Sequence, residues 1–126
     1  MKKDKIIYWI TTGLVSVMML FSGYSYFANP DMTAGFKMMG FPDFFRVELG
    51  VAKIIAGIVL LIPFQSRIKD WAYSGLGIVF ISAAYTHICL HDEIGKTIAP
   101  LVFLGIMSIS YLFYIKINKT VDTTNV

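Results

Sequence analysis

Four apolar blocks separated by short polar breaks make up most of the chain, at about residues 6–27, 45–62, 71–91 and 98–115. A helix needs ~20 predominantly apolar residues to cross the ~30 Å hydrocarbon core of a bilayer. Each block has roughly that length. The pattern therefore predicts an all-α membrane protein in which four transmembrane helices form an antiparallel bundle.

The breaks between the blocks add two expectations. Met32–Met39, in the longest break, is too apolar for a free loop and too short to cross, so we expect a short helical segment lying in the membrane interface between the first two spans. Lys116 and Lys119 should end the fourth span, which leaves residues 116–126 as a polar, unstructured tail. Residues 1–126 are expected to form a single transmembrane domain.

Composition agrees with a membrane protein. Hydrophobic residues make up 56% of the chain, charged residues only 15%, and the mean hydropathy is +0.67, whereas soluble domains average ~45–50% and ~25% respectively. A very apolar soluble helical bundle is the weaker alternative. The basic residues are spread over the breaks and form no patch with interleaved aromatics, which argues against nucleic-acid binding.

The distribution of basic residues predicts the orientation. With four spans, seven basic residues fall on the side of the two termini, namely Lys2, Lys3, Lys5, Arg67, Lys69, Lys116 and Lys119. The opposite side has Lys37, Arg46 and Lys96, and Lys53 lies within a span. Because cytoplasmic loops carry the excess of Lys and Arg, both termini are expected in the cytoplasm.

Two charges interrupt the second apolar block, at Glu48 and Lys53. A charge near the middle of a bilayer costs at least ~2.5–3.5 kcal/mol, so each should have a partner inside the bundle. On a helical wheel the two residues flank the small side chains of Ala52 and Ala56, opposite a branched aliphatic face. We therefore expect both charges to point into the bundle, each towards a partner on another helix, because a spacing of five suits no direct pair.

Nearby helices offer such partners. His87 ends a face of the third span that includes Tyr73, and helix direction places His87 at about the depth of Glu48. Ser22 and Tyr26 end the first span in the same layer. The sequence thus predicts an outward-facing polar pocket of Glu48, Lys53, His87, Ser22, Tyr26 and Tyr73. Two interpretations stay open: a ligand or partner site, or a polar network that only fixes helix register.

Sequence motifs for known chemistry are missing. Cys89, His91, Asp92 and Glu93 match no metal-site spacing, so no metal is expected and an exposed polar loop is the preferred interpretation. The chain has no haem attachment motif, phosphate loop, dinucleotide fingerprint or placed nucleophile, so no catalytic residue is assigned.

Several segments together resemble the DoxX-like family of small bacterial membrane proteins. They are Tyr8-Trp9 with Phe21-Ser22-Gly23; Gly40-Phe41-Pro42; Glu48-Leu49-Gly50 with Lys53, Gly57 and Pro63; Lys69, Trp71-Ala72-Tyr73 and Gly75; and Ser82-Ala83 with His87. The resemblance implies a four-helix membrane protein of the bacterial inner membrane. It also implies, by analogy, a membrane partner of a quinol-oxidising or other redox enzyme, or a lipid or sterol binder.

Three functions follow in order of preference. The first is a non-enzymatic protein that binds a small lipid-soluble ligand or a partner protein through the polar pocket. The second is an accessory membrane subunit of a quinone-linked oxidoreductase, with quinone the one cofactor left open. The third is a proton- or ion-coupled carrier. In each case we expect contacts with membrane lipids, and the chain could form a homo-oligomer.

Overall fold

The computed structural model describes residues 2–63 and 67–124, and within them all regular secondary structure is helical. In order, the helices are α1 (Lys2–Ala28), α2 (Pro30–Met38), α3 (Asp43–Leu60), α4 (Arg67–Cys89) and α5 (Ile94–Thr124). The all-α prediction is confirmed. The described part has five helices rather than four, because the short segment expected after the first span is the separate helix α2.

The predicted fourth block and its tail need a correction. We expected the helix to end near residue 115, but α5 continues to Thr124, so residues 116–124 are helical and not an unstructured tail. Lys116 and Lys119 are good helix formers, and residues 116–124 contain neither Gly nor Pro. Charged residues therefore end the apolar stretch without ending the helix.

Three of the helices are long and apolar enough to cross a membrane: α1, α4 and α5 up to Asn118. In contrast, α3 has a suitable length of 18 residues but carries four charged side chains, Asp43, Arg46, Glu48 and Lys53. Length and composition therefore support three spans, and the predicted fourth span depends on how these charges are accommodated.

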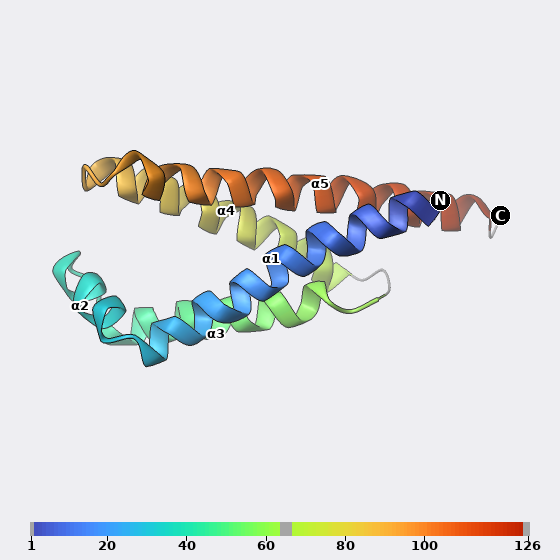
Figure 1. The fold of residues 1–126 in the computed structure, drawn as a ribbon. Coiled ribbons are helices and arrows are strands. Elements are labelled where there is room, and N and C mark those ends of the chain that lie inside the picture. The colour runs from blue at the N-terminus through green and yellow to red at the C-terminus, as the bar shows by residue number, and fades with distance from the viewer. Residues whose placement is uncertain (1, 64–66, 125–126) are drawn as a thin grey trace.

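The four long helices lie alongside one another with alternating direction (Figure 1). Both ends of the chain, the end of α3 and the start of α4 lie at one end of the molecule, which we call the terminal end. The short helix α2 and the turn between α4 and α5 lie at the opposite end. Helix α1 packs most extensively against α3 and also against α5, α4 packs on α5, and the contact between α3 and α4 is the loosest of these.

Helix α2 is delimited by its own sequence. Pro30 stands in its first turn, where a missing N–H costs nothing, and the side chain of Asn29 accepts a hydrogen bond from the Asp31 N–H at 3.0 Å. At the other end Gly40 has a φ of 86°, and the Phe41 N–H donates to the Phe36 carbonyl at 3.0 Å. This is a Schellman ending, which turns the chain back towards α3.

Glycines bring α1 and α3 into close contact. A Cβ atom added to Gly23 of α1 would lie 2.7 Å from Ile54 Cγ1 and 2.8 Å from the Gly50 carbonyl oxygen of α3. One added to Gly57 would lie 3.1 Å from the Ser16 carbonyl oxygen. Small residues allow this approach in lipid, where van der Waals packing drives helix association. The face of α3 that carries Gly50 and Gly57 is therefore the face that packs on α1.

Large apolar side chains cover the outside of the molecule. Val17 of α1 and Ile78 of α4 are both 66% exposed, and Leu112 of α5 is 63% exposed. Monomeric soluble proteins rarely expose contiguous apolar patches beyond a few hundred Å². An apolar exterior of this extent suits hydrocarbon as the surrounding medium.

Candidate functional site

Lys53 is one of two basic side chains of α3 that are hydrogen-bonded to α1, the other being Arg46, which donates to the Tyr26 carbonyl. The Lys53 Nζ donates hydrogen bonds to Ser22 Oγ at 3.0 Å and to the Tyr26 hydroxyl at 2.7 Å, both on α1. The same ammonium lies 4.2 Å from the centroid of the Tyr26 ring, a cation–π distance. Three of the six residues expected in the polar pocket thus lie together.

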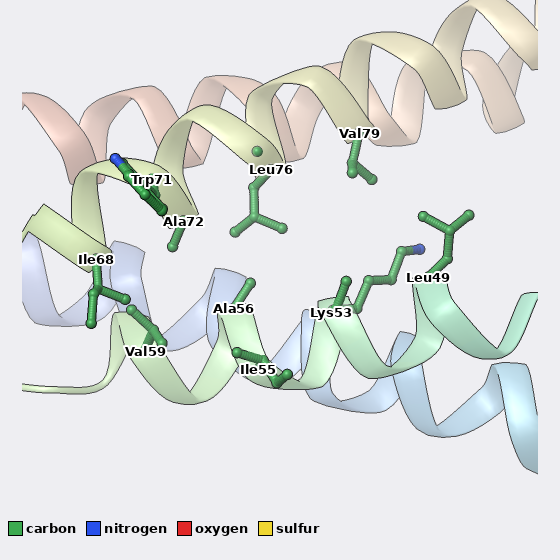
Figure 2. A pocket seen from close by; sticks show the side chains of 12 residues that line it. Leu49, Lys53, Ile55, Ala56, Val59, Ile68, Trp71, Ala72, Leu76 and Val79 are labelled. Carbon is green, nitrogen blue, oxygen red and sulfur yellow. The ribbon is translucent and has the colours of Figure 1, made fainter. Parts of the chain in front are cut away.

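Lys53 forms part of the lining of an apolar groove between α3 and α4. The groove has a volume of about 380 Å³ and is lined by Leu49, Ala52, Lys53, Ile55, Ala56, Val59, Ile68, Trp71, Ala72, Gly75, Leu76 and Val79. Figure 2 shows Leu76 and Val79 pointing from α4 towards α3, while the Lys53 side chain runs along α3 towards Leu49. Lys53 is the one charged residue of this lining. The groove exists because α3 and α4 pack loosely.

Glu48 does not join Lys53. Its side chain is exposed, and in the described part of the chain it has no hydrogen bond or ion pair, so the expectation that it points into the bundle is wrong for this chain alone. At ~100° per residue, Gly50 and Gly57 lie ~160–180° from Glu48 around the helix, whereas Lys53 lies only ~40–60° from them. Because the glycine face packs on α1, Lys53 reaches α1 and Glu48 points away.

His87 has a local partner instead of Glu48. Its Nδ1 lies 2.7 Å from Asp92 Oδ2, and both side chains are about one-third exposed. The Asp92 N–H also donates to the His87 carbonyl at 3.1 Å, so the pair closes the turn between α4 and α5. The start of α3 and the end of α4 do lie at the same end of the molecule (Figure 1).

Tyr73 belongs to a different cluster. Its hydroxyl lies 2.7 Å from Ser110 Oγ, which in turn lies 2.6 Å from Thr12 Oγ1, so one buried chain of hydroxyls joins α4, α5 and α1. Its ring packs against Tyr111 and Tyr114, with centroids 5.0 and 5.7 Å away. The expectation that Tyr73 shares a pocket with Lys53 is therefore wrong.

Lys69 is the residue that sequence reasoning missed. We expected it in the basic break before the third apolar block, but its side chain is 1% exposed and its Nζ donates to the Tyr8 hydroxyl. The signal was present: at ~100° per residue, Lys69 falls within ~60° of Tyr73, Leu76 and Phe80, the buried stripe of α4. Because the predicted helix began at residue 71 and α4 begins at Arg67, Lys69 was not included in the helical wheel of this span.

Residues that could ligate a metal are scattered. In residues 2–63 and 67–124, no three His, Cys, Asp or Glu side chains come together in a group that could hold a metal ion. Cys89 is exposed. The chemistry that the site near Lys53 offers is hydrogen-bond donation and a positive charge beside an apolar groove.

Comparison with known proteins gives one result. The model of the DoxX-like family matches residues 10–110, which includes all of α2, α3 and α4 and most of α1 and of the apolar part of α5. No curated protein and no solved structure matches the chain significantly.

Proposed function

The chain belongs to the DoxX-like family, and from that premise we propose that it binds a small lipid-soluble molecule in the groove between α3 and α4. The ligand would carry an oxygen that accepts a hydrogen bond from Lys53. One observation carries the proposal: an ammonium group stands at the wall of an otherwise apolar groove, with no carboxylate within ion-pair distance in the described part of the chain.

The donor count at Lys53 supports a ligand. An ammonium group has three N–H donors, and Ser22 and Tyr26 accept two of them. The Tyr26 hydroxyl, which accepts from Lys53, keeps its own proton to donate. A buried charge whose donors are not all satisfied is costly, and an oxygen acceptor in the groove would reduce that cost.

The size and lining of the groove support the same proposal. Pockets for small molecules typically measure ~300–1,000 Å³ and are mostly apolar with a few polar groups that fix orientation. The groove measures about 380 Å³ and has Lys53 as its charged group. A molecule with an apolar body and one polar end would match it.

The membrane arrangement that we propose has four spans, with α3 as the fourth and both termini in the cytoplasm, in a bacterial inner membrane. Three of the four charges of α3 support it: Asp43 stands at its first residue, Arg46 donates to the Tyr26 carbonyl of α1, and Lys53 is hydrogen-bonded, whereas Glu48 is exposed. The excess of basic residues at the terminal end supports the orientation. In this arrangement α2 would lie in the opposite interface.

A quinone is one ligand of the right chemistry, because its carbonyl oxygens accept hydrogen bonds and its body is apolar. If the ligand is a quinone, the chain would serve as a membrane subunit of a quinone-linked oxidoreductase. The donors Lys53 and Tyr26 support this second function to the same degree as they support a non-redox ligand.

Ligand retention tests the proposal. The protein is purified in a mild detergent and extracted with organic solvent, and the extract is compared by mass spectrometry with that of Lys53→Leu. We expect one lipophilic compound, enriched over its level in the membrane, to be lost from Lys53→Leu and reduced in Tyr26→Phe, which keeps the ring but removes the hydroxyl.

Lys96→Leu is the matched control, because Lys96 is exposed in the first turn of α5, at the other end of the molecule from the termini. It should retain the compound at the wild-type level. Identical extracts from all four proteins, each verified as folded by circular dichroism, would rule the proposal out.

A further inference from the structure

A second pocket lies at the terminal end, apart from the groove. It has a volume of about 190 Å³ and is lined by Lys5, Tyr8, Trp9, Pro63, Lys69, Tyr114, Ile117 and Asn118. None of these residues lines the groove between α3 and α4. The volume is many times the ~10–15 Å³ that a single water requires, so the pocket has room for a polar group of several atoms.

Lys69 brings a positive charge to this pocket. Its Nζ lies 5.1 Å from the centroid of the Tyr8 ring, 5.3 Å from that of Tyr114 and 5.8 Å from that of Trp9. These rings and the Tyr8 hydroxyl hold the ammonium in place, yet the hydroxyl is its one hydrogen-bond acceptor within the described residues. Two of its three N–H donors are left for another acceptor.

Acidic side chains nearby do not neutralise Lys69. The Asp4 carboxylate accepts from Lys116 Nζ at 3.3 Å, and Asp70 is exposed. No carboxylate lies within ion-pair distance of Lys69 in residues 2–63 and 67–124. Because a buried charge without a counter-charge is strongly unfavourable, the pocket favours an anion.

Asn118 is a second, independent indication. Its Nδ2 is buried and has no hydrogen-bond acceptor among the residues that the structure describes, and Asn118 lines the same pocket as Lys69. Buried polar groups are nearly always paired, so an unpaired donor calls for an explanation. Two sets of unsatisfied donors on one cavity, from α4 and α5, favour a ligand with several oxygen acceptors.

We propose that this pocket, built by Lys69, Asn118, Tyr8 and Trp9, binds a phosphate group. A phosphate offers several acceptor oxygens and negative charge, and charge-assisted hydrogen bonds to it are stronger than neutral ones. The phosphate could belong to an anionic phospholipid or be free in solution. Trp9 and the exposed Lys5 at the rim are residue types that gather at the level of lipid head groups.

Trp9 fluorescence tests the proposal, since Trp9 lines the pocket. The chain has two tryptophans, so Trp71→Phe leaves Trp9 as the single reporter. The full chain in a nonionic detergent is titrated at constant ionic strength with dioctanoyl phosphatidylglycerol, with dioctanoylglycerol, which lacks the phosphate, and with inorganic phosphate. We expect a saturable change with a phosphate-bearing probe and none with dioctanoylglycerol.

Saturation by the phospholipid at far lower concentration than by inorganic phosphate would identify a lipid head group as the source. Comparable saturation by both would identify free phosphate, and either result supports the site. Lys69→Met should weaken binding at least ~10-fold and Asn118→Leu ~3–10-fold, as expected for a charged and a neutral hydrogen bond. Lys96→Met, exposed at the opposite end, should bind as the parent does.

Three results would overturn the proposal: no saturable response to any probe, equal affinity for dioctanoylglycerol, or unchanged affinity in Asn118→Leu. If Lys69→Met does not fold, Asn118→Leu and the comparison with dioctanoylglycerol still decide. A failure here would leave the groove between α3 and α4 untouched, because the two cavities share no residue.

Discussion

Ser110 is the residue through which three helices exchange hydrogen bonds, since its hydroxyl lies within 2.6–2.7 Å of the hydroxyls of Thr12 and Tyr73. Ser110→Ala would leave both of these buried groups with one partner fewer. We expect a loss of ~1–3 kcal/mol in the free energy of unfolding, measured by thermal or chemical unfolding in detergent.

Ser108→Ala is the matched control, because Ser108 is exposed and its hydroxyl donates to the Leu104 carbonyl of its own helix at 2.8 Å. It should change stability by less than ~0.5 kcal/mol. Equal effects of the two substitutions would show that the hydroxyl chain contributes nothing specific.

Glu48 gives a second prediction at the scale of single residues. Its carboxylate is exposed and has no partner in the described part of the chain. Glu48→Gln removes the charge and should leave the free energy of unfolding within ~0.5 kcal/mol of wild type, or raise it. Thermal unfolding of the purified protein measures this. A clear loss of stability would mean that Glu48 has a partner outside this chain, such as a second copy.

At the scale of helices, the contact between α1 and α3 depends on Gly23. A Cβ atom there would approach Ile54 Cγ1 to 2.7 Å and the Gly50 carbonyl oxygen to 2.8 Å, so Gly23→Ala forces the two helices apart. We expect a destabilisation of ~1–3 kcal/mol, as for overpacking in a core. It should also weaken the hydrogen bonds between Lys53 and α1.

Gly13→Ala tests the same exchange on the same helix where nothing lies within 4 Å of the added Cβ. Alanine is a better helix former than glycine by ~0.8–1.0 kcal/mol, so this variant should be more stable than wild type. We thus expect Gly23→Ala to lower the free energy of unfolding and Gly13→Ala to raise it. A loss of stability in both variants would contradict this prediction. Unfolding in detergent, followed by circular dichroism, provides the comparison.

The sequence predicted where the long helices lie along the chain, but not which face of each helix packs against its neighbours. Apolar blocks located all four long helices, because span length follows directly from bilayer thickness. The face of α3 that meets α1 is set by Gly50 and Gly57, and close backbone approach is a tertiary property that hydropathy does not record. The expected partner on another helix was therefore found for Lys53 and not for Glu48. Lys69 was missed because α4 begins at Arg67, about one turn before the apolar block that starts at residue 71.

For the molecule as a whole, the proposed four-span arrangement can be tested with Cys89, the single cysteine of the chain. Cys89 is exposed at the end of α4, opposite the terminal end. In intact cells a membrane-impermeant maleimide should label Cys89 from outside. It should not label a cysteine placed at Arg67 in a Cys89→Ser background until the membrane is permeabilised.

If α3 does not cross the membrane while the N-terminus is cytoplasmic, the two positions exchange sides. Arg67→Cys would then be labelled in intact cells and Cys89 would be protected. That result would replace the four-span arrangement with a three-span one, in which the groove between α3 and α4 could not lie within the bilayer.

Occupancy of the groove between α3 and α4 is the central claim, and a pair of glycine substitutions tests it most directly. Gly75 lines the groove and Gly105 does not, yet both are exposed helical glycines whose added Cβ would meet nothing within 4 Å. Gly75→Leu therefore fills the groove with little strain, and Gly105→Leu adds the same side chain elsewhere. The measurement is the amount of lipophilic compound retained per protein after purification. We expect the compound to be lost from Gly75→Leu and fully retained in Gly105→Leu. Equal retention in both variants would contradict a ligand in this groove.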